Sequence, residues 1–348
     1  MADERLIGLG ASAGGIETLF ELVAGLDHDL PAALFVVLHQ SASARTTLPD
    51  LLGRRCELPV DAARHGAPVR AGRVVVAPPD RHLLVQDGRV VLSRGPHENG
   101  HRPGVDPLFR SLALEAGPSA TGVVLSGLLD DGAAGLLEIV RHGGNAVVQD
   151  PGEALFDAMP RAALDQVPGA VVAPAGAVGT ALREIVARDP LGTRRPSPQL
   201  VYEVRVSRAQ PPETVDEDPP GEPAGLACPD CSGPLFALGD DRLHRFRCRV
   251  GHAWSQDSLR SAQDVVVEHA LYEALRALED KAALAGRVAD AADSRGSALV
   301  ARRSRRKAHE ALRQAAVLRR LLSADVDDGE DQDGHDESTT EQEGQEGR

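Results

Sequence analysis

The chain has 348 residues, of which 42% are hydrophobic and 3% aromatic. This length allows one to three domains, and few aromatic residues beside abundant glycine favour an α/β sheet over an aromatic-rich β-sandwich. No apolar run approaches the ~20 residues of a membrane span, and the opening MADERLIGLG lacks the layout of a signal peptide. Four cysteines are too few for a disulfide scaffold. We therefore expect a cytoplasmic protein without membrane insertion.

The net charge of −14 is concentrated at the C-terminal end. Residues 324–348 hold eleven acidic residues and one arginine, which gives −10 and leaves about −4 for the rest of the chain. This composition predicts a disordered tail, and it argues weakly against nucleic acid as a partner. The basic run 302–307 favours a solvated helix face or an intramolecular resting place for the tail, and a surface for nucleic acid or an acidic partner is the alternative.

Residues 1–190 alternate strand and helix signals. Strands are predicted at ERLIGLGA, ALFVVLH, RVVVAPP, TGVVLSG, NAVVQD and GAVVAP, and an extended hairpin at HLLVQDGRVVLS with its turn at Asp87-Gly88. Helices are predicted at GGIETLFELVAGL, TTLPDLLGRR, VDPLFRSLALEAG, DGAAGLLEIVRHGG and AGAVGTALREIVA. Apolar strands that alternate with helices are typical of a mainly parallel sheet covered on both faces, so we predict a doubly wound α/β fold.

The rest of the chain divides by composition into a proline-rich linker (191–224), a cysteine module (225–256), an α-helical hairpin (257–323) and the acidic tail (324–348). VYEVRV (201–206) indicates a stray strand within the linker. The turn of the helical hairpin is expected at 294–297. We expect the linker to isolate the cysteine module from the first domain.

The first strand runs into a glycine-rich turn at residues 8–15. Gly8, Gly10 and Ala13 fit a loose dinucleotide-binding pattern, but that pattern needs an acidic residue at the end of the second strand, which here reads LFVVLHQS. Gly10-Ala-Ser12-Ala-Gly14 also fits G-x-S-x-G, the turn that lifts a nucleophilic serine above a sheet edge. A structural turn with an incidental serine is equally consistent with these residues.

A serine nucleophile needs a base and an orienting carboxylate. His39 ends the second strand, and Asp130 and Asp131 follow the strand TGVVLSG. Because parallel strands end at one shared edge, these side chains are expected to meet Ser12 there. The alternatives are a histidine bound by backbone and aspartates that cap the next helix. The chain order Ser–His–Asp differs from the Ser–Asp–His order of α/β-hydrolases and implies another serine-hydrolase fold.

Residues 5–188 resemble the catalytic domain of the CheB protein-glutamate methylesterases of bacterial chemotaxis. The resemblance lies in IGLGASAGGIETL (7–19), VVLHQ (36–40), GRVVVAPPDRHLLV (72–85), RPGVDPLFRSLA (102–113), VVLSGLLDDGAAGL (123–136) and QDPGEALFDAMPRAAL (149–164). It implies a serine hydrolase that demethylates glutamate methyl esters on a chemoreceptor or receptor-like protein, and that deamidates certain receptor glutamines.

The same resemblance assigns residues to roles. It implies a catalytic triad of Ser12, His39 and Asp131, with Asp131 rather than Asp130 in the family position. It also implies oxyanion donors at the backbone N–H groups of Ala13 and Leu128.

Two departures from the family bear on function. The N-terminal phospho-receiver domain is absent from this sequence, so we expect no gating by phosphorylation of this chain, and the C-terminal segments are additional. A non-catalytic adaptor, in which the first domain is a scaffold and the helical and acidic C-terminus recruits a partner, is therefore the alternative function.

The cysteine module has the spacing of a metal site, C-x₂-C-x₁₆-C-x₃-H, formed by Cys228, Cys231, Cys248 and His252. The two pairs would close across a hairpin in FALGDDRLHRFRC and hold a structural zinc ion, with His244 as an alternative fourth ligand. The module resembles a zinc-ribbon-like appendage of some CheB-type proteins. A redox pair or plain surface thiols would also fit the cysteines, and Cys56 is expected to be an inert packed thiol. We expect hydrolase activity to survive loss of the metal.

Overall fold

The computed structural model describes residues 4–45, 47–190, 192, 195–210, 221–238 and 244–327. The chain divides into two compact units, residues 1–262 and 263–348. The predicted disorder of the acidic tail lies outside the described residues from 328 onward. Residues 324–327 belong to a helix instead, because α9 continues to Asp327.

The first unit contains a seven-stranded sheet in which every neighbouring pair is parallel, which confirms the predicted fold class. β1 lies at the centre, with β2 on one side and β7 on the other. From edge to edge, the strands are β3 (Val60–Ala62), β4 (Arg73–Val76), β2 (Ala32–Leu38), β1 (Arg5–Ala11), β7 (Ala120–Val124), β8 (Asn145–Gln149) and β9 (Val171–Ala173). The short edge strand β3 was not predicted from the sequence.

Helices cover both faces of this sheet. Ile7, Leu9 and Ala11 of β1 join one core cluster, while Leu6 joins the other, because successive strand side chains point to opposite faces. The first cluster includes residues of α1 (Gly15–Ala24), α2 (Leu48–Gly53) and α6 (Ala175–Val186). The second includes residues of α3 (Val105–Ala116), α4 (Ala133–Arg141) and α5 (Ala158–Gln166), and a 3₁₀ turn (Gly117–Ser119) follows α3.

The glycines of β1 serve the packing of α3. A Cβ atom on Gly10 would lie 2.3 Å from Val105 Cγ1, and one on Gly8 would lie 2.8 Å from Phe109 Cε1. Both distances are far below van der Waals contact, so only glycine lets the helix approach the strand this closely. The pattern that suggested dinucleotide binding is therefore accounted for by packing.

Two predicted details of the first domain have different outcomes. The hairpin of β5 (His82–Gln86) and β6 (Arg89–Ser93) is confirmed, and its turn residues Asp87 and Gly88 both have positive φ, as a two-residue type I′ turn requires. Helix α5 was not predicted. Pro160 in its first turn resembles a helix breaker, although proline is tolerated in that turn.

The stray strand expected at 201–206 is wrong, because this segment belongs to α7 (Pro198–Ser207). The Ser197 side chain accepts a hydrogen bond from Leu200 N at 3.1 Å and caps the helix. Leu200 and Val204, one helical turn apart, are buried in the core cluster that contains α3. The alternating pattern of VYEVRV suggested a strand, but the cap and the four-residue spacing determine a helix.

The cysteine module forms a four-stranded antiparallel sheet of β10 (Glu222–Ala227), β11 (Pro234–Leu238), β12 (Arg245–Cys248) and β13 (Ala253–Ser255). Pairing of β11 with β12 matches the predicted hairpin, although residues 239–243 between them lie outside the described residues. The module belongs to the same compact unit as the parallel sheet. It is therefore not isolated by the linker, contrary to our expectation.

A buried cluster of charges joins α3, α7 and the module. Glu203 Oε2 lies 3.2 Å from Arg110, 3.0 Å from Arg245 and 3.1 Å from Arg247. Glu98 pairs with Arg110 and lies 3.4 Å from Arg247. All five side chains are at most 9% exposed. Burial would raise the pKa of Glu203, but the three arginines outweigh it and hold that pKa well below its usual range.

We predict that Glu203→Ala destabilises the protein by about 3–5 kcal/mol, because removing one partner leaves buried arginine charges uncompensated. The free energy of unfolding in urea measures this loss. Glu184→Ala is the control, since Glu184 of α6 forms an exposed pair with Arg188, and this substitution should cost less than about 1 kcal/mol. Equal losses in the two variants would contradict the assigned role of the cluster.

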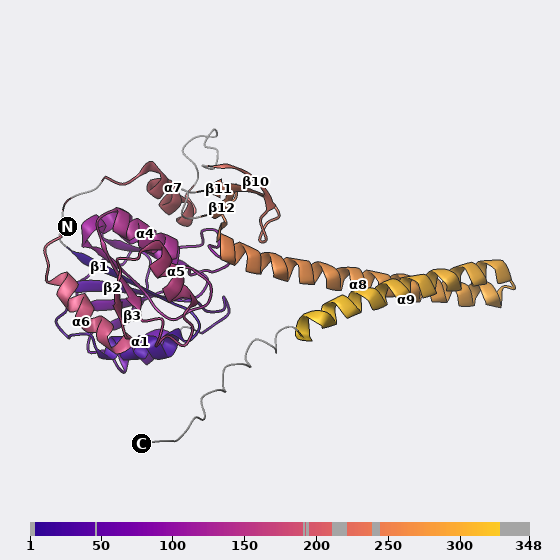
Figure 1. The fold of residues 1–348 in the computed structure, drawn as a ribbon, viewed down its shortest axis with the longest axis horizontal. Helices are drawn as coiled ribbons and strands as arrows, with labels where there is room; N and C mark the ends of the chain where they lie inside the picture. Colours follow the sequence, from indigo (N-terminus) through magenta and orange to yellow (C-terminus); the bar gives the residue numbers. More distant parts are fainter. Residues whose placement is uncertain are drawn as a thin grey trace, which may run out of the picture. The chain divides into compact units, whose positions relative to one another are not determined.

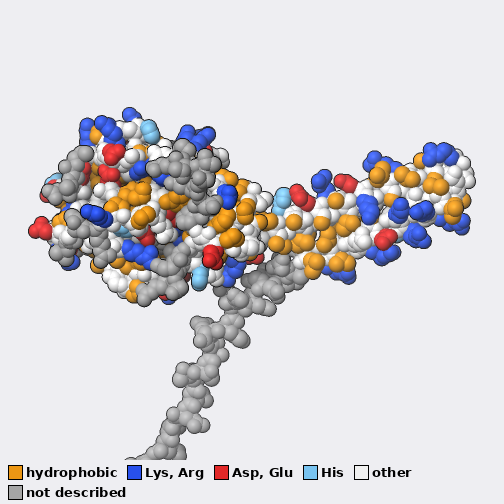
Figure 2. Space-filling view, turned by 90° about the horizontal axis from the view of Figure 1, so that it is seen from above, with side chains coloured by type: hydrophobic (Ala, Val, Ile, Leu, Met, Phe, Trp, Pro, Cys, Tyr) orange, Lys and Arg blue, Asp and Glu red, His pale blue; other side chains and the backbone are white. Residues whose placement is uncertain are grey.

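The helical hairpin and its turn are confirmed. Helix α8 (Gln256–Ser294) begins in the first unit, and from residue 263 onward it lies beside helix α9 (Ala298–Asp327) in the second unit (Figure 1). Small buried residues allow this close packing: Ala282, Ala289, Ala292, Ala301, Ala311 and Ala315. Basic side chains are visible along the hairpin in Figure 2, and the run 302–307 is exposed except for Ser304. Among the described residues, no helix has the length and apolar character of a membrane span.

Candidate active site and metal centre

Three strand ends place the predicted catalytic residues together. β1 lies between β2 and β7, so the strand order reverses at β1, and such switch points form ligand crevices at the carboxyl ends of strands. Ser12 follows β1 directly, and its N–H donates to Ser126 O at 2.9 Å. His39 follows β2, and its N–H donates to Ala11 O at 3.1 Å. Asp131 lies in the segment between β7 and α4.

Ser12, His39 and Asp131 form one chain of hydrogen bonds. His39 Nδ1 lies 3.1 Å from Ser12 Oγ, and His39 Nε2 lies 2.7 Å from Asp131 Oδ2. The side chains of His39 and Asp131 are 5% and 3% exposed. With its proton on Nε2, the imidazole donates to Asp131 and presents the Nδ1 lone pair to the serine. This arrangement can accept a proton from Ser12.

The Asp131 carboxylate accepts several hydrogen bonds. Val105 N–H donates to Oδ2 at 2.7 Å, and Asn99 Nδ2 and Asp106 N–H donate to Oδ1 at 3.0 and 3.3 Å. Burial alone would raise the pKa of Asp131, but its hydrogen bond with His39, the charge on His39 and the Val105 N–H outweigh burial. The pKa of Asp131 is therefore held well below its usual range, and the group remains ionised.

The Asp130 side chain points away from the hydrogen-bonded group of Ser12, His39 and Asp131. Its Oδ1 accepts hydrogen bonds from Ser255 Oγ at 2.6 Å and Ser258 Oγ at 3.0 Å, both at the junction of β13 and α8. Burial raises the pKa of Asp130 despite these two hydrogen bonds. The geometry thus brings Asp131, and not Asp130, to His39.

The predicted alternative, that these aspartates cap α4, is wrong for their side chains. Asp106 performs that function, because its Oδ1 accepts the N–H groups of Gly132 at 3.1 Å and Gly135 at 2.6 Å. Burial and the neighbouring charge of Asp131 raise the pKa of Asp106 to about 7.

Residues 126–128 pack against the serine turn. Ser126 Oγ donates to Ala13 O at 2.8 Å. A Cβ atom on Gly127 would lie 2.8 Å from Ser12 Cβ and 2.0 Å from Met159 Sδ, so the backbone there directly borders Ser12. Gly14 has φ +68° and precedes the first residue of α1, whose N–H donates to Ser12 O at 3.0 Å. The first N–H groups of a helix lack intrahelical acceptors and can bind an anion.

Two residues beside the site were not predicted. The His101 ring stacks on the His39 ring with centroids 3.7 Å apart, and Asn99 binds Asp131 as described. Burial, together with the charge on His39, lowers the pKa of His101 to about 4. Both residues lie in ENGH, directly before the RPGVD segment. Polar residues concentrated before a buried helix are the sequence signal that could have revealed them.

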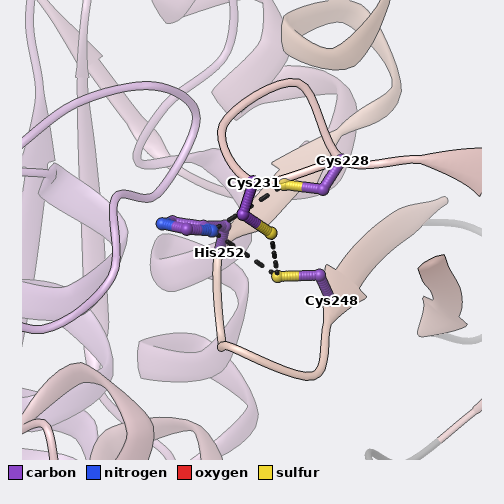
Figure 3. A group of neighbouring side chains, drawn as sticks. All are labelled: Cys228, Cys231, Cys248 and His252. Atoms are coloured by element: carbon purple, nitrogen blue, oxygen red, sulfur yellow. Dashed lines mark hydrogen bonds between the residues drawn. The ribbon is translucent and has the colours of Figure 1, made fainter. Parts of the chain in front are cut away.

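The cysteine module brings its four predicted ligands together (Figure 3). Cys231 Sγ lies 3.6 Å from Cys248 Sγ, and His252 Nδ1 lies 3.8 Å from Cys228 Sγ and 3.5 Å from Cys248 Sγ. Tetrahedral zinc with ordinary bond lengths places two sulfurs about 3.8 Å apart, and sulfur and nitrogen about 3.6 Å apart. The donor set and its spacing therefore fit a divalent metal ion.

Two further residues bear on this metal centre, the alternative ligand His244 and the neighbouring Asp230. The alternative ligand His244 is exposed and lies outside the group. Asp230 Oδ2 lies 3.7 Å from His252 Nε2 and 3.4 Å from His97 Nδ1. A carboxylate on the far nitrogen of a ligating histidine fixes the ring orientation. Burial and the neighbouring Cys228 raise the pKa of Cys248 to about 11, so a cation would be needed to hold it as a thiolate.

Fold and site together define an α/β protein with a Ser–His–Asp chain at the switch point of a doubly wound sheet. The family model described as CheB methylesterase matches residues 7–182, just over half of the chain, and the chain belongs to this family.

Curated relatives and a solved structure are similar to the same part of the chain. The protein-glutamate methylesterase/protein-glutamine glutaminase 2 of Anaeromyxobacter dehalogenans is 40% identical over 183 residues, covering 52% of this chain and 53% of the relative. The corresponding protein 1 of Xanthomonas euvesicatoria is 40% identical over 164 residues, 46% of each chain. The chain thus spans about half the length of these relatives. The Thermotoga maritima CheB methylesterase catalytic domain matches with TM-score 0.50 and 28% identity, over 52% of this chain and 98% of that domain.

The lowered pKa of His101 predicts acid sensitivity. Its folded pKa of about 4 lies below the unfolded value of about 6.5. The folded state holds His101 neutral, so the protein has its full stability above pH 6.5. It loses stability as the pH falls toward 4, because the unfolded state takes up the proton first. We expect His101→Gln to remove about 2–3 kcal/mol of the stability change over this range. Urea unfolding at several pH values measures it. His28→Gln, at a side chain 76% exposed, is the control, and an unchanged pH slope in His101→Gln would contradict the prediction.

Proposed function

We propose that this protein is a serine hydrolase that demethylates glutamate methyl esters on a chemoreceptor or receptor-like protein. The hydrogen-bonded chain of Ser12, His39 and Asp131 carries the proposal. Membership of the CheB methylesterase family, and relatives named as protein-glutamate methylesterases, support the choice of ester.

In the proposed first step, Ser12 Oγ attacks the ester carbonyl while His39 Nδ1 takes its proton. Asp131 holds the ring in the required tautomer and stabilises the imidazolium that forms. The carbonyl oxygen becomes negative, and the backbone N–H groups of Ala13 and Leu128 are the proposed donors to it. Their support is the place of Ala13 before α1 and the contacts of Ser126 and Gly127, the residues directly before Leu128, with the serine turn.

The intermediate then collapses. His39 returns the proton to the methoxy oxygen, methanol leaves, and the glutamyl group remains esterified to Ser12. Water attacks this acyl-enzyme as His39 accepts its proton, and the same proton returns to Ser12 Oγ as the glutamate carboxylate is released. A glutamine side chain can follow the same path with ammonia as the leaving group, which is the deamidation included in the names of the relatives.

We propose further that Cys228, Cys231, Cys248 and His252 bind one structural zinc ion. The four ligand atoms leave no position for a reacting group. The support is their mutual spacing and the Asp230 carboxylate beside His252. None of the four cysteines forms a disulfide, which is typical of the reducing cytoplasm where we place the protein.

We predict that Ser12→Ala abolishes methanol release from a methylated chemoreceptor fragment, because the attacking oxygen is lost. Asp131→Asn should lower kcat by about 10⁴-fold, since the amide supports the wrong tautomer of His39. Asp130→Asn should be milder because Asp130 does not contact His39. Gas chromatography of released methanol measures each rate.

Ser43→Ala, an exposed serine beyond β2, is the control and should retain wild-type activity. Full methanol release by Ser12→Ala would refute the mechanism, and a larger loss in Asp130→Asn than in Asp131→Asn would reassign the carboxylate. No release by the wild type would favour the adaptor function.

We predict about one zinc ion per chain, as four protein ligands imply. Atomic emission analysis of the purified protein measures the ratio. Cys228→Ser should lose the metal, because a hydroxyl is a poor replacement for a thiolate ligand. Cys56→Ser is the control, since Cys56 packs against the core of the parallel sheet. Metal-free wild-type protein with a protease-resistant cysteine module would contradict the prediction.

A further inference from the structure

One loop joins the cysteine module to the candidate active site. Residues 97–101 precede α3 and pair with β13 of the module. Asn99 N–H donates to Ala253 O at 2.8 Å, and Ala253 N–H donates to His97 O at 3.2 Å. Ser255 N–H donates to Asn99 Oδ1 at 2.8 Å. The loop is therefore held at the edge of the module by these hydrogen bonds and by one isolated parallel bridge between Glu98 and Ala253.

The same loop holds the catalytic chain. Asn99 is 7% exposed and uses both ends of its amide: Oδ1 accepts from the module, and Nδ2 donates to Asp131 Oδ1 at 3.0 Å. Among the residues that the structure describes, the other hydrogen bond to Asp131 Oδ1 is the longer 3.3 Å bond from Asp106 N–H. His101 of this loop stacks on His39. The loop thus borders both partners of the Asp131–His39 pair.

Two further sets of contacts join the module to the neighbourhood of Asp131 and to the loop. Ser255 Oγ and Ser258 Oγ bind Asp130, the residue directly before Asp131. Asp230 lies between His252 of the candidate metal centre and His97 of the loop. The orientation of His97 is thereby linked to a metal ligand, and the path from the metal centre to the triad consists of adjacent groups.

The only tryptophan of the chain lies in this interface. Trp254 of β13 is 3% exposed, and its ring lies 3.6 Å from the position that a Cβ atom on Gly100 would take. Its fluorescence therefore reports whether β13 is docked on the loop, independently of any substrate.

We propose that the cysteine module is part of the catalytic apparatus: β13 holds the positioning residue Asn99, Asn99 fixes Asp131 against His39, and the metal maintains β13 in place. This inference rests on the proposed function of Ser12, His39 and Asp131. It replaces the expectation that hydrolase activity survives loss of the metal. The module then acts as a metal-dependent support for the triad.

The test compares two variants of the full-length protein. Asn99 has φ +52°, so Asn99→Gly removes the side chain without backbone strain. Asn99→Asp keeps the shape and the Oδ1 acceptor for Ser255. It loses the Nδ2 donor to Asp131 and Asp106, and it places another carboxylate beside Asp131. Asn145→Asp is the matched control, since Asn145 begins β8 at the amino end of the sheet, and it is the only other asparagine.

We expect Asn99→Gly and Asn99→Asp to lower kcat for methanol release by about 10- to 100-fold, less than loss of the Asp131 charge itself. KM should stay within about twofold, because Asn99 positions Asp131 and does not bind substrate. The low-field NMR resonance of the His39 Nε2–H proton should shift or broaden in both variants and stay unchanged in Asn145→Asp.

Metal removal by a chelator, or by Cys228→Ser, should produce the same loss of kcat together with a red shift of Trp254 emission. Zinc added back to the chelated wild type should restore kcat, the emission maximum and the low-field resonance together. In Cys228→Ser, zinc should restore none of them.

The outcomes separate this inference from the proposed function. If the wild type releases methanol and both Asn99 variants keep kcat within twofold, the coupling is overturned and the function stands. If the wild type releases no methanol but its low-field resonance is lost on Asn99 substitution and on metal removal, the coupling stands and the function fails. If circular dichroism shows Asn99→Gly to be unfolded, the shape-preserving Asn99→Asp decides by the same criteria.

Discussion

A single buried carboxylate organises this protein. Asp131 is 2% exposed, and a charge removed from water is tolerated only where hydrogen bonds replace hydration. The backbone at the start of α3 supplies two donors, the loop before α3 supplies Asn99, and β2 supplies His39. Each of these elements must be in place before the charge is satisfied. The catalytic geometry and the docking of several distant segments are therefore one structural requirement.

Close packing of α3 on β1 is what makes those donors available. Glycine at positions 8 and 10 removes the side chains that would otherwise push the helix from the sheet. The N-terminus of α3 then reaches the crevice beside β1, where its N–H groups point at Asp131. The turn between β1 and α1 presents Ser12 at the end of the strand. Glycines that resemble a nucleotide-binding pattern thus serve to bring Ser12, His39 and Asp131 together.

The sequence predicted the features that depend on local patterns of residues. Apolar strands and their polar ends predicted the sheet and the meeting of Ser12, His39 and Asp131, because parallel strands share one edge. The spacing of the cysteines predicted the ligand group. It did not predict Asn99, whose partners lie 32 and 156 residues further along the chain. Such contacts follow from tertiary packing, and the hydrophobic periodicity of the sequence does not indicate them. The strand expected at 201–206 was wrong for the same reason, since burial of Leu200 and Val204 against the domain favours the helix.

The buried charge cluster also bears on how the chain matures during synthesis. Glu98, Arg110 and Glu203 emerge from the ribosome before Arg245 and Arg247, and by themselves they amount to a buried net charge of −1. Arg245 and Arg247 of β12 change this sum to +1, so the two carboxylates have all of their cationic partners only once β12 is made. The N-terminal α/β domain can collapse earlier, but the loop beside the triad acquires its partners only once β13 has been translated. The nascent chain therefore carries Ser12 for some time before Asn99 can bind both Asp131 and β13.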